Sequence, residues 1–278
     1  MIPKVIDMRV LKREFSRFSC FIIDLDGVVW KGNEIIPGAV DAVNALLKLD
    51  KIVIFMTNNS TLSRKSYIKR LKQIGVNVDS EKLIVVNSAY ATALFLKSRI
   101  GISEAYVVGE AGLIEELALN DIKIVNNRFK WGMKVDCVVV GLDRDLTYLK
   151  LAQAVDAIYH GALFIATNDD STLPAEHGLL PGAGSIVAAI SRATGRDPDF
   201  IVGKPQRFIF ELALSKAEVN PEDTIVIGDR LDTDIRGARN MGLCSALVLT
   251  GVINNPKQVE DSCFKPDFII KSLADVFK

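Results

Sequence analysis

Cysteine and histidine are scarce in this chain, which has four cysteines and two histidines among its 278 residues. No two cysteines have the C-x-x-C spacing of a zinc or redox site, and three of them lie in or beside apolar runs. We therefore expect buried, reduced thiols rather than metal ligands or disulfides. The cysteines are Cys20, Cys137, Cys244 and Cys263.

An excess of charge of either sign is also absent. The 34 basic and 34 acidic side chains balance, and they are interspersed along the chain rather than grouped in blocks. Proteins that bind nucleic acid usually carry a basic surface. The composition therefore gives no reason to expect a nucleic-acid partner.

Long apolar runs are missing as well. No uninterrupted apolar stretch approaches the ~20 residues needed to cross a bilayer. Residues 1–18 are mixed and charged, unlike a secretory signal with its basic segment and apolar run. These absences predict a cytoplasmic protein without a membrane partner.

Short apolar runs alternate with amphipathic segments of helical length along nearly the whole chain. The predicted strands are 21–25, 51–57, 105–109, 122–125, 135–142, 163–167, 200–203, 224–228, 245–249 and 267–270. The predicted helices are 38–49, 64–74, 146–160, 184–194, 208–216 and 233–241. Near-continuous apolar strands that alternate with helices predict an α/β fold, in which helices cover both faces of a mostly parallel sheet.

Two carboxylates stand at the end of the first apolar strand. Asp24 and Asp26 share one face of an extended chain, so their negative charges would repel unless a cation offset them. Oxygen ligands without nearby cysteine or histidine favour Mg²⁺. The alternative is a simple turn, because aspartate and glycine both favour turns. An EF-hand loop is excluded because its twelfth position, which requires glutamate, is Ile35.

Polar groups also follow other predicted strands. Residues 57–60 end one strand, Lys204 follows a second, and Asp229 ends a third. A lone lysine is usually a solvated surface residue, but ligands of parallel sheets bind at the carboxyl ends of the strands. We therefore expect these groups to converge on one site, which disfavours the simple-turn interpretation.

The converging groups suit attack on a phosphate. Mg²⁺ held by Asp24 and Asp229, together with the ammonium of Lys204, would offset the charge of the phosphate. Asp24 could act as the nucleophile, because carboxylates form covalent phosphoryl intermediates. Asp26 could serve as general acid and then as general base. Thr57 could donate a hydrogen bond to phosphate, or cap the helix that begins near Ser63, or do both.

Neighbouring polar residues have supporting roles. Asn58 and Asn59 are candidates for gripping phosphate or substrate through backbone or amide groups. Asp234 is expected to hold Lys204 or a metal-bound water rather than bind the metal directly. One of the acidic residues near Asp229 is also expected to cap the helix that follows.

These motifs together resemble those of a known family. Residues 24–28, 56–60, 203–205 and 228–234 read DLDGV, MTNNS, GKP and GDRLDTD, in that order. The set is similar to the haloacid dehalogenase (HAD) superfamily of phosphatases. It resembles most the NagD-type subclass, which includes 4-nitrophenyl, phosphoglycolate and pyridoxal phosphatases.

The resemblance implies a role for each matching residue. Asp24 would be the nucleophile, Asp26 the acid/base, and Thr57 and Lys204 the groups that stabilise the phosphate. Mg²⁺ would be bound by Asp24, Asp229 and the backbone carbonyl of Asp26. The implied fold is a Rossmann-like core with a large inserted α/β cap domain.

The long segment between Thr57 and Lys204 is far more than one crossover connection needs, and it contains strands and helices of its own. We divide the chain into a core of residues 1–88 and 198–278 and a cap of residues 89–197. The cap contains a polar loop at 168–178, whose Asn168 and Asp170 are expected to face the substrate. The alternative is an ordinary solvated loop.

Two further features of the cap have simpler interpretations. His177, in the same loop, is more often incidental than catalytic in such a position. The glycine-rich residues 181–185 lack the lysine of a phosphate-binding P-loop, and they are interpreted as a turn into a helix.

The predicted function is Mg²⁺-dependent hydrolysis of small phosphorylated metabolites through an aspartyl-phosphate intermediate. Two alternatives remain open: a phosphosugar mutase that uses the same chemistry, and a non-catalytic sensor of phosphometabolites. The partner is a small phosphorylated metabolite, and a homodimer is possible. The physiological substrate depends on the cap surface and cannot be read from the motifs.

Overall fold

The computed structural model describes residues 10–175, 178–260 and 262–278. Its larger sheet is fully parallel and contains six strands in the order β15-β14-β13-β1-β4-β5. These strands are β1 (Cys20–Ile23), β4 (Ile52–Thr57), β5 (Leu83–Asn87), β13 (Thr224–Gly228), β14 (Cys244–Val248) and β15 (Phe268–Ile270). The central strands β1 and β13 are buried along their whole length, as their unbroken apolar sequences predict.

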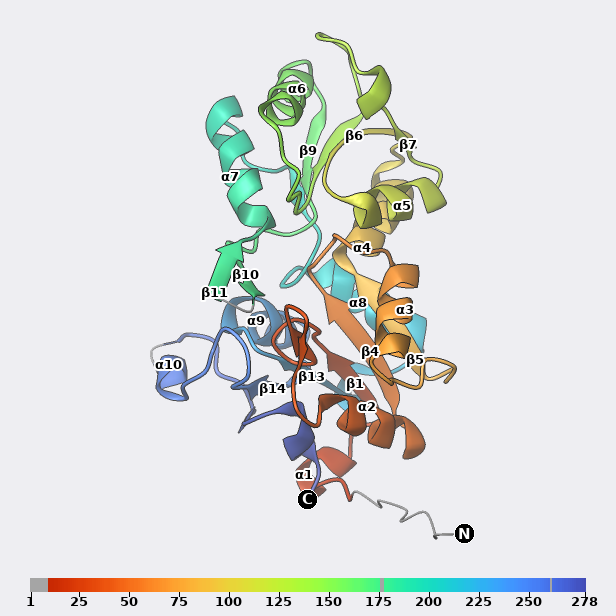
Figure 1. The fold of residues 1–278 in the computed structure, drawn as a ribbon, viewed down its shortest axis with the longest axis vertical. Coiled ribbons are helices and arrows are strands. Elements are labelled where there is room, and N and C mark those ends of the chain that lie inside the picture. The colour runs from red at the N-terminus through yellow and green to blue at the C-terminus, as the bar shows by residue number, and fades with distance from the viewer. Residues whose placement is uncertain (1–9, 176–177, 261) are drawn as a thin grey trace.

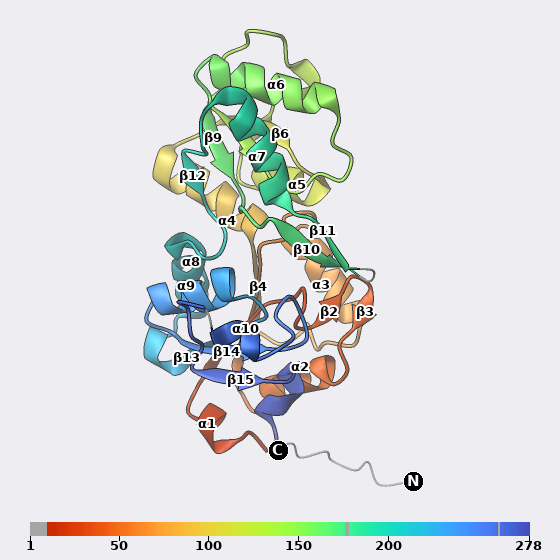
Figure 2. The same ribbon diagram turned by 90° about the vertical axis from the view of Figure 1, so that its left-hand side faces the viewer.

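Helices cover both faces of this sheet (Figure 2). Phe21 and Ile23 of β1 pack with α2 and α3 in one apolar cluster, whereas Ile22 packs with α8 and α9 in another. This alternation follows from the two-residue period of a strand. The helices and turns of this part are α1 (Arg13–Ser16), α2 (Ala39–Lys48), α3 (Arg64–Gln73), α8 (Arg207–Ala217), η3 (Pro221–Asp223), η4 (Leu231–Ile235), α9 (Arg236–Asn240), α10 (Lys257–Glu260) and η5 (Leu273–Val276).

A smaller parallel sheet lies above the larger one (Figure 1). Its strand order is β12-β9-β8-β6-β7. The strands are β6 (Glu104–Val108), β7 (Lys123–Ile124), β8 (Cys137–Val140), β9 (Leu163–Ala166) and β12 (Phe200–Ile201). The helices and turns of this part are α4 (Ser88–Phe95), η1 (Leu96–Ile100), α5 (Ala111–Leu119), η2 (Asn126–Arg128), α6 (Tyr148–Tyr159) and α7 (Ala183–Thr194).

Two short hairpins complete the described elements. β2 (Trp30–Lys31) pairs with β3 (Glu34–Ile35), and β10 (Thr172–Ala175) pairs with β11 (Gly178–Pro181). The second hairpin extends from the smaller sheet toward the larger one, and it lies between the two parts in both views (Figures 1 and 2).

The predicted elements agree with the observed ones except in two places. The strand predicted at 200–203 is shortened to β12, and it joins the smaller sheet rather than the larger one. The polar segment 168–178 is not simply a loop, because β10 begins within it. Residues 181–185 lead into a helix as predicted, because α7 begins at Ala183. Several elements were not predicted from the sequence, among them strands β2, β3, β5 and β11 and helices α1, α4, α5 and α10.

Each difference has its own physical reason. A two-residue strand such as β12 carries no periodicity that could identify its sheet. In the second hairpin, Pro174 and Pro181 lie within strands that pair only with each other, a setting that tolerates proline. His177 lies outside the described residues.

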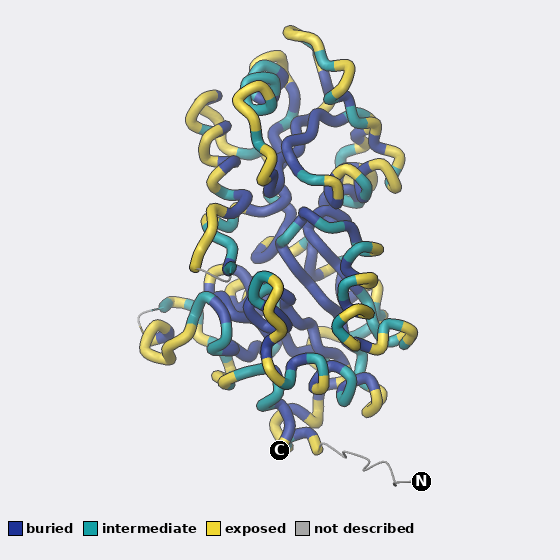
Figure 3. The backbone as a smooth tube through the Cα atoms, viewed as in Figure 1, coloured by how far each residue is buried: buried dark blue, intermediate teal, exposed yellow. Residues whose placement is uncertain are grey.

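Several polar contacts join the two parts of the molecule. The carboxylate of Glu116 on α5 is buried and accepts hydrogen bonds from the backbone N–H and the guanidinium of Arg64 on α3. The Arg64 guanidinium also stacks on the ring of Tyr90, at 3.4 Å from its centroid. The backbone is buried where the two parts meet (Figure 3).

The cysteines are free thiols, as predicted. Burial raises the pKa values of Cys20 and Cys137 to about 12, so both are protonated at neutral pH. Cys244 is half-buried and Cys263 is exposed. Among the described residues, no helix has both the length and the apolar character that a membrane span requires.

Candidate active site

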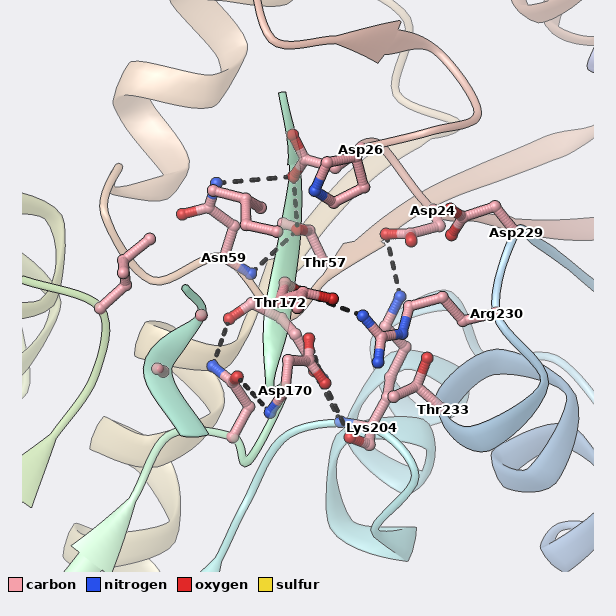
Figure 4. Close-up of a pocket in the computed structure, with 17 residues that line it drawn as sticks. Asp24, Asp26, Thr57, Asn59, Asp170, Thr172, Lys204, Asp229, Arg230 and Thr233 are labelled. Atoms are coloured by element: carbon pink, nitrogen blue, oxygen red, sulfur yellow. Dashed lines mark hydrogen bonds and ion pairs between the residues drawn. The ribbon is translucent and has the colours of Figure 1, made fainter. Parts of the chain in front are cut away.

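The ammonium of Lys204 lies at the centre of the site (Figure 4). Its Nζ is 2.9 Å from Oδ1 of Asp24 and 2.7 Å from Oδ1 of Asp234, and it donates to the carbonyl of Met56. The side chains of all three charged residues are at most 8 % exposed. Lys204 is therefore a buried counter-charge to two carboxylates rather than a solvated surface residue.

A third carboxylate joins this cluster. Oxygen atoms of Asp24, Asp229 and Asp234 all lie within 4.8 Å of one another. Oδ2 of Asp229 accepts a hydrogen bond from the N–H of Val252, whereas its buried Oδ1 has no partner among the described residues. A buried carboxylate oxygen without a donor is costly unless a cation satisfies it. The donor set therefore fits a hard divalent cation such as Mg²⁺.

The electrostatics agree with this assignment. Burial, followed by repulsion from Asp234, raises the pKa of Asp229 to about 7. Burial also holds the pKa of Asp24 well above its ordinary value, although the nearby ammonium of Lys204 opposes this effect. Both shifts mean that the metal-free site disfavours the ionised forms of Asp24 and Asp229, a cost that a bound cation would offset.

Glycine is needed where the backbone approaches Asp229. A Cβ at Gly251 would lie 1.9 Å from Oδ2 of Asp229, and a Cβ at Gly27 would lie 2.4 Å from the same atom. Gly27 also has a φ of +85°, which side-chain-bearing residues rarely adopt. Both glycines therefore allow the loops after β1 and β14 to close around this carboxylate.

Asp26 lies beside Thr57 and Asn59 in the pocket (Figure 4). Its Oδ1 accepts a hydrogen bond from Nε1 of Trp30 at 3.0 Å. Its Oδ2 is 3.5 Å from both the hydroxyl of Thr57 and the amide nitrogen of Asn59. Burial raises the pKa of Asp26, while the bond from Trp30 lowers it.

Thr57 ends β4 and faces the pocket. Its hydroxyl accepts a hydrogen bond from the N–H of Asn59. The N-cap of α3 is Ser63, whose side chain accepts from the N–H of Ser66. The alternative that Thr57 caps this helix is therefore wrong, and its hydroxyl remains close to the reacting groups.

Asn58 and Asn168 connect the two parts of the molecule. Oδ1 of Asn58 accepts from the N–H of Lys204, and its Nδ2 donates to the carbonyl of Lys204 and to the carboxylate of Asp170. Nδ2 of Asn168 donates to the carbonyl of Asn58. Both amides are thus bonded to protein groups, so we assign them to positioning Lys204 and Asp170 rather than to direct contact with phosphate.

Arg230 is a charged residue of the pocket that sequence reasoning missed. Its buried guanidinium pairs with Asp232 and donates to the carbonyl of Thr172 in β10. Asp232 is therefore a partner of Arg230. Arg230 is the N-cap residue of η4, and its side chain makes no capping hydrogen bond. An arginine beside acidic residues in a loop suggests a solvated cluster. Only its position after Asp229 could have signalled a role.

The pocket itself encloses about 490 Å³ of empty space, counting its open mouth. Every predicted site residue except Asp234 lines it, and residues 172–174 of the second hairpin form part of its wall. Burial raises the pKa of Asp170 to about 6, with Arg230 as the main opposing charge.

Sequence comparisons place these features in a family. A model described as haloacid dehalogenase-like hydrolase matches residues 21–123, and a second HAD-like hydrolase model matches residues 201–276. An acid sugar phosphatase from Staphylococcus saprophyticus is 35% identical over 263 residues, covering 95% of this chain and 98% of the relative. The chain belongs to the haloacid dehalogenase-like hydrolase family. The resemblance in the motifs is thus confirmed.

Solved structures of this family have the same fold. A p-nitrophenyl phosphatase from Archaeoglobus fulgidus is 37% identical with a TM-score of 0.83, covering 93% of this chain and 97% of that one. A glycerol phosphate phosphatase from Mycobacterium tuberculosis in complex with magnesium is 35% identical with a TM-score of 0.85, covering 97% and 79%. The predicted class, a Rossmann-like HAD core with an α/β cap, is therefore confirmed.

Proposed function

We propose that this HAD hydrolase is a Mg²⁺-dependent phosphatase of small phosphomonoesters. The observation that carries the proposal is the meeting of Asp24, Lys204 and Asp229 in one buried pocket. The relatives support it, because they are named as phosphatases of sugars, glycerol 3-phosphate, phosphoglycolate and 4-nitrophenyl phosphate.

The metal would be held by the carboxylates of Asp24 and Asp229 and by the backbone carbonyl of Asp26. When bound, it supplies positive charge that offsets the charge of the phosphate. Lys204 pairs with the carboxylate of Asp24 and opposes the rise in its pKa that burial causes. Asp234 also pairs with the ammonium of Lys204.

The reaction proceeds in two steps. A carboxylate oxygen of Asp24 attacks phosphorus, and the leaving oxygen takes a proton from Asp26 as its bond to phosphorus breaks. Asp26, now ionised, takes a proton from a water molecule that attacks the aspartyl phosphate. This step releases inorganic phosphate and restores the carboxylate of Asp24. Thr57 and Asn59 lie where they can donate hydrogen bonds to the phosphate or hold Asp26.

We propose that residues 1–88 and 198–278 form the core and that residues 89–197 form the cap. The pairing of β12 with β9 favours a return to the core a few residues later than this boundary. A cytoplasmic location and a homodimer stay predictions.

The direct test is hydrolysis of 4-nitrophenyl phosphate by the purified protein, with and without Mg²⁺ and a chelator. A panel of glycerol phosphate, phosphoglycolate, sugar phosphates and pyridoxal phosphate, ranked by kcat/KM, would then define the substrate. Turnover that a chelator does not affect would contradict the proposal. Transfer of phosphate between positions of a sugar, without release, would support the mutase alternative.

Mg²⁺ should stabilise the protein more strongly as the pH rises. In the metal-free fold the pKa of Asp229 is raised to about 7 from 3.8, so the folded state binds more protons than the unfolded state between these values. The free energy of unfolding of the metal-free protein therefore falls as the pH rises between these two pKa values. The cation needs the ionised carboxylate, so its binding strengthens over the same range.

The measurement is the increase in melting temperature caused by Mg²⁺ at about pH 5 and about pH 8. We expect a clearly larger increase at the higher pH. The Asp229→Asn variant should show little increase at either pH. An increase that is equal at both pH values would contradict the proposed coupling.

Asp26→Asn should slow turnover by about 10² to 10⁴-fold while leaving KM within a few-fold of wild type. Asparagine keeps the size of the side chain, but it can neither give a proton to the leaving oxygen nor take one from water. Steady-state kinetics with an alkyl phosphate would measure the effect. Wild-type turnover in this variant would remove Asp26 from the mechanism.

A further inference from the structure

The two oxygens of Asp26 have different surroundings. Oδ1 accepts the indole N–H of Trp30 at 3.0 Å. Among the described residues, Oδ2 has only long contacts of 3.5 Å, to Thr57 and Asn59, and both residues line the pocket. In Figure 4 the carboxylate is directed toward these two residues. One oxygen is therefore held and the other faces the substrate space.

Trp30, whose indole holds Oδ1, is itself fixed in place. It is 1% exposed, and its ring is stacked on Tyr67 with an interplanar angle of 5°. The guanidinium of Arg70 lies 4.1 Å from the ring centroid. Tyr67 and Arg70 share one face of α3, because residues three apart are neighbours on a helix.

The backbone of Trp30 is tied to the same loop. Its carbonyl accepts from the N–H of Gly27 at 2.7 Å, and its own N–H donates to the carbonyl of Leu25. Asp26 and Trp30 also form an isolated bridge. The indole donor is thus held rigidly, by both packing and backbone, at a fixed place relative to Asp26.

We propose that Trp30 is a positioning residue, whose indole N–H holds Oδ1 of Asp26 so that Oδ2 exchanges protons with substrate and water. The inference rests on the proposed acid/base role of Asp26. An indole nitrogen can only donate a hydrogen bond. When Asp26 is protonated, this bond therefore favours the arrangement in which the proton resides on Oδ2, on the pocket side.

The positioning of Asp26 by Trp30 should matter more for some leaving groups than for others. An alkyl phosphate releases a strongly basic alkoxide, which needs a proton from Asp26 as the bond breaks. 4-Nitrophenyl phosphate releases a weakly basic phenolate, which needs little help. Loss of correct positioning should therefore reduce kcat/KM for the alkyl substrate more than for the aryl substrate.

The test is the Trp30→Phe variant, which keeps an aromatic ring but removes the donor. We expect kcat/KM for an alkyl phosphate that the wild type accepts, such as glycerol phosphate, to fall about tenfold more than kcat/KM for 4-nitrophenyl phosphate. In the Asp26→Asn background, Trp30→Phe should alter kcat/KM by less than about twofold, because the carboxylate that Trp30 positions is absent.

Two controls separate positioning from packing. Trp131→Phe makes the same chemical change at a cap position that is 62% exposed, and it should leave both substrates unaffected. Leu71→Ala opens a cavity in the buried cluster that contains Trp30 but keeps the indole donor. It should lower the melting temperature without changing the ratio of the two kcat/KM values.

Equal losses for both substrates in Trp30→Phe would overturn the inference, as would an undiminished effect in the Asp26→Asn background. Either result would leave the proposed phosphatase function standing. If the wild-type protein hydrolysed neither substrate, the proposed function itself would fail.

Discussion

Replacing Asp24 with asparagine should reduce phosphate release by about 10⁴-fold or more, the scale of loss when a hydrolase loses its nucleophile. The amide has nearly the same shape as the carboxylate, but it cannot form the aspartyl phosphate. Initial rates with 4-nitrophenyl phosphate at saturating Mg²⁺ would measure the loss. Turnover near the wild-type rate would remove Asp24 as the nucleophile.

The same variant should not be less stable than the metal-free wild type. Burial holds the pKa of Asp24 well above its ordinary value, and the charges of Asp229 and Asp234 add to this effect. Removing one of three neighbouring carboxylates relieves this repulsion, so we expect an equal or higher melting temperature without metal. A lower melting temperature would mean that the carboxylate stabilises the fold through its contact with Lys204.

Much of this site could be predicted because three of its segments end adjacent strands. β13, β1 and β4 are neighbours in the larger sheet. Asp229, Asp24 and Thr57 therefore reach the same edge, as the rule for parallel sheets requires. Apolar runs and strand-end polar residues were sufficient to identify this group.

Lys204 reaches the site by a different route from the one predicted. It follows β12, which pairs with β9 in the smaller sheet. Its position is set instead by Asn58, whose side chain bonds to the N–H and the carbonyl of Lys204. Contacts between residues so far apart in sequence leave no local pattern, so the strand-end rule assigned this lysine to the site without revealing the contacts that hold it there.

The roles of Trp30 and Arg230 were hidden for a similar reason. An apolar tryptophan after a turn suggests a core residue, and Trp30 is indeed buried. Only the folded chain shows that its nitrogen meets Asp26 and that Arg230 meets the carbonyl of Thr172. Periodicity predicts which side chains are buried, but not which polar atoms they meet.

Replacing Lys204 with methionine should affect stability as well as activity. The side chain is buried, and the nearby charges of Asp234 and Asp24 keep its pKa raised against the opposing effect of burial. Removing one partner of a buried ion pair leaves uncompensated charge and typically costs about 3–5 kcal/mol. We expect a loss of that order in the metal-free protein and a fall in kcat of at least about 10²-fold.

A second substitution can separate the two effects. Asp234 also contacts the ammonium, and the proposed mechanism gives it no direct part in the chemistry. Asp234→Asn added to Lys204→Met should therefore recover part of the lost stability by removing a carboxylate without a partner, but it should restore no activity. Melting temperatures and kcat of the two single variants and the double variant would measure this. Recovery of activity together with stability would mean that Lys204 serves only to keep the acidic cluster folded, and that positive charge at the phosphate comes from elsewhere.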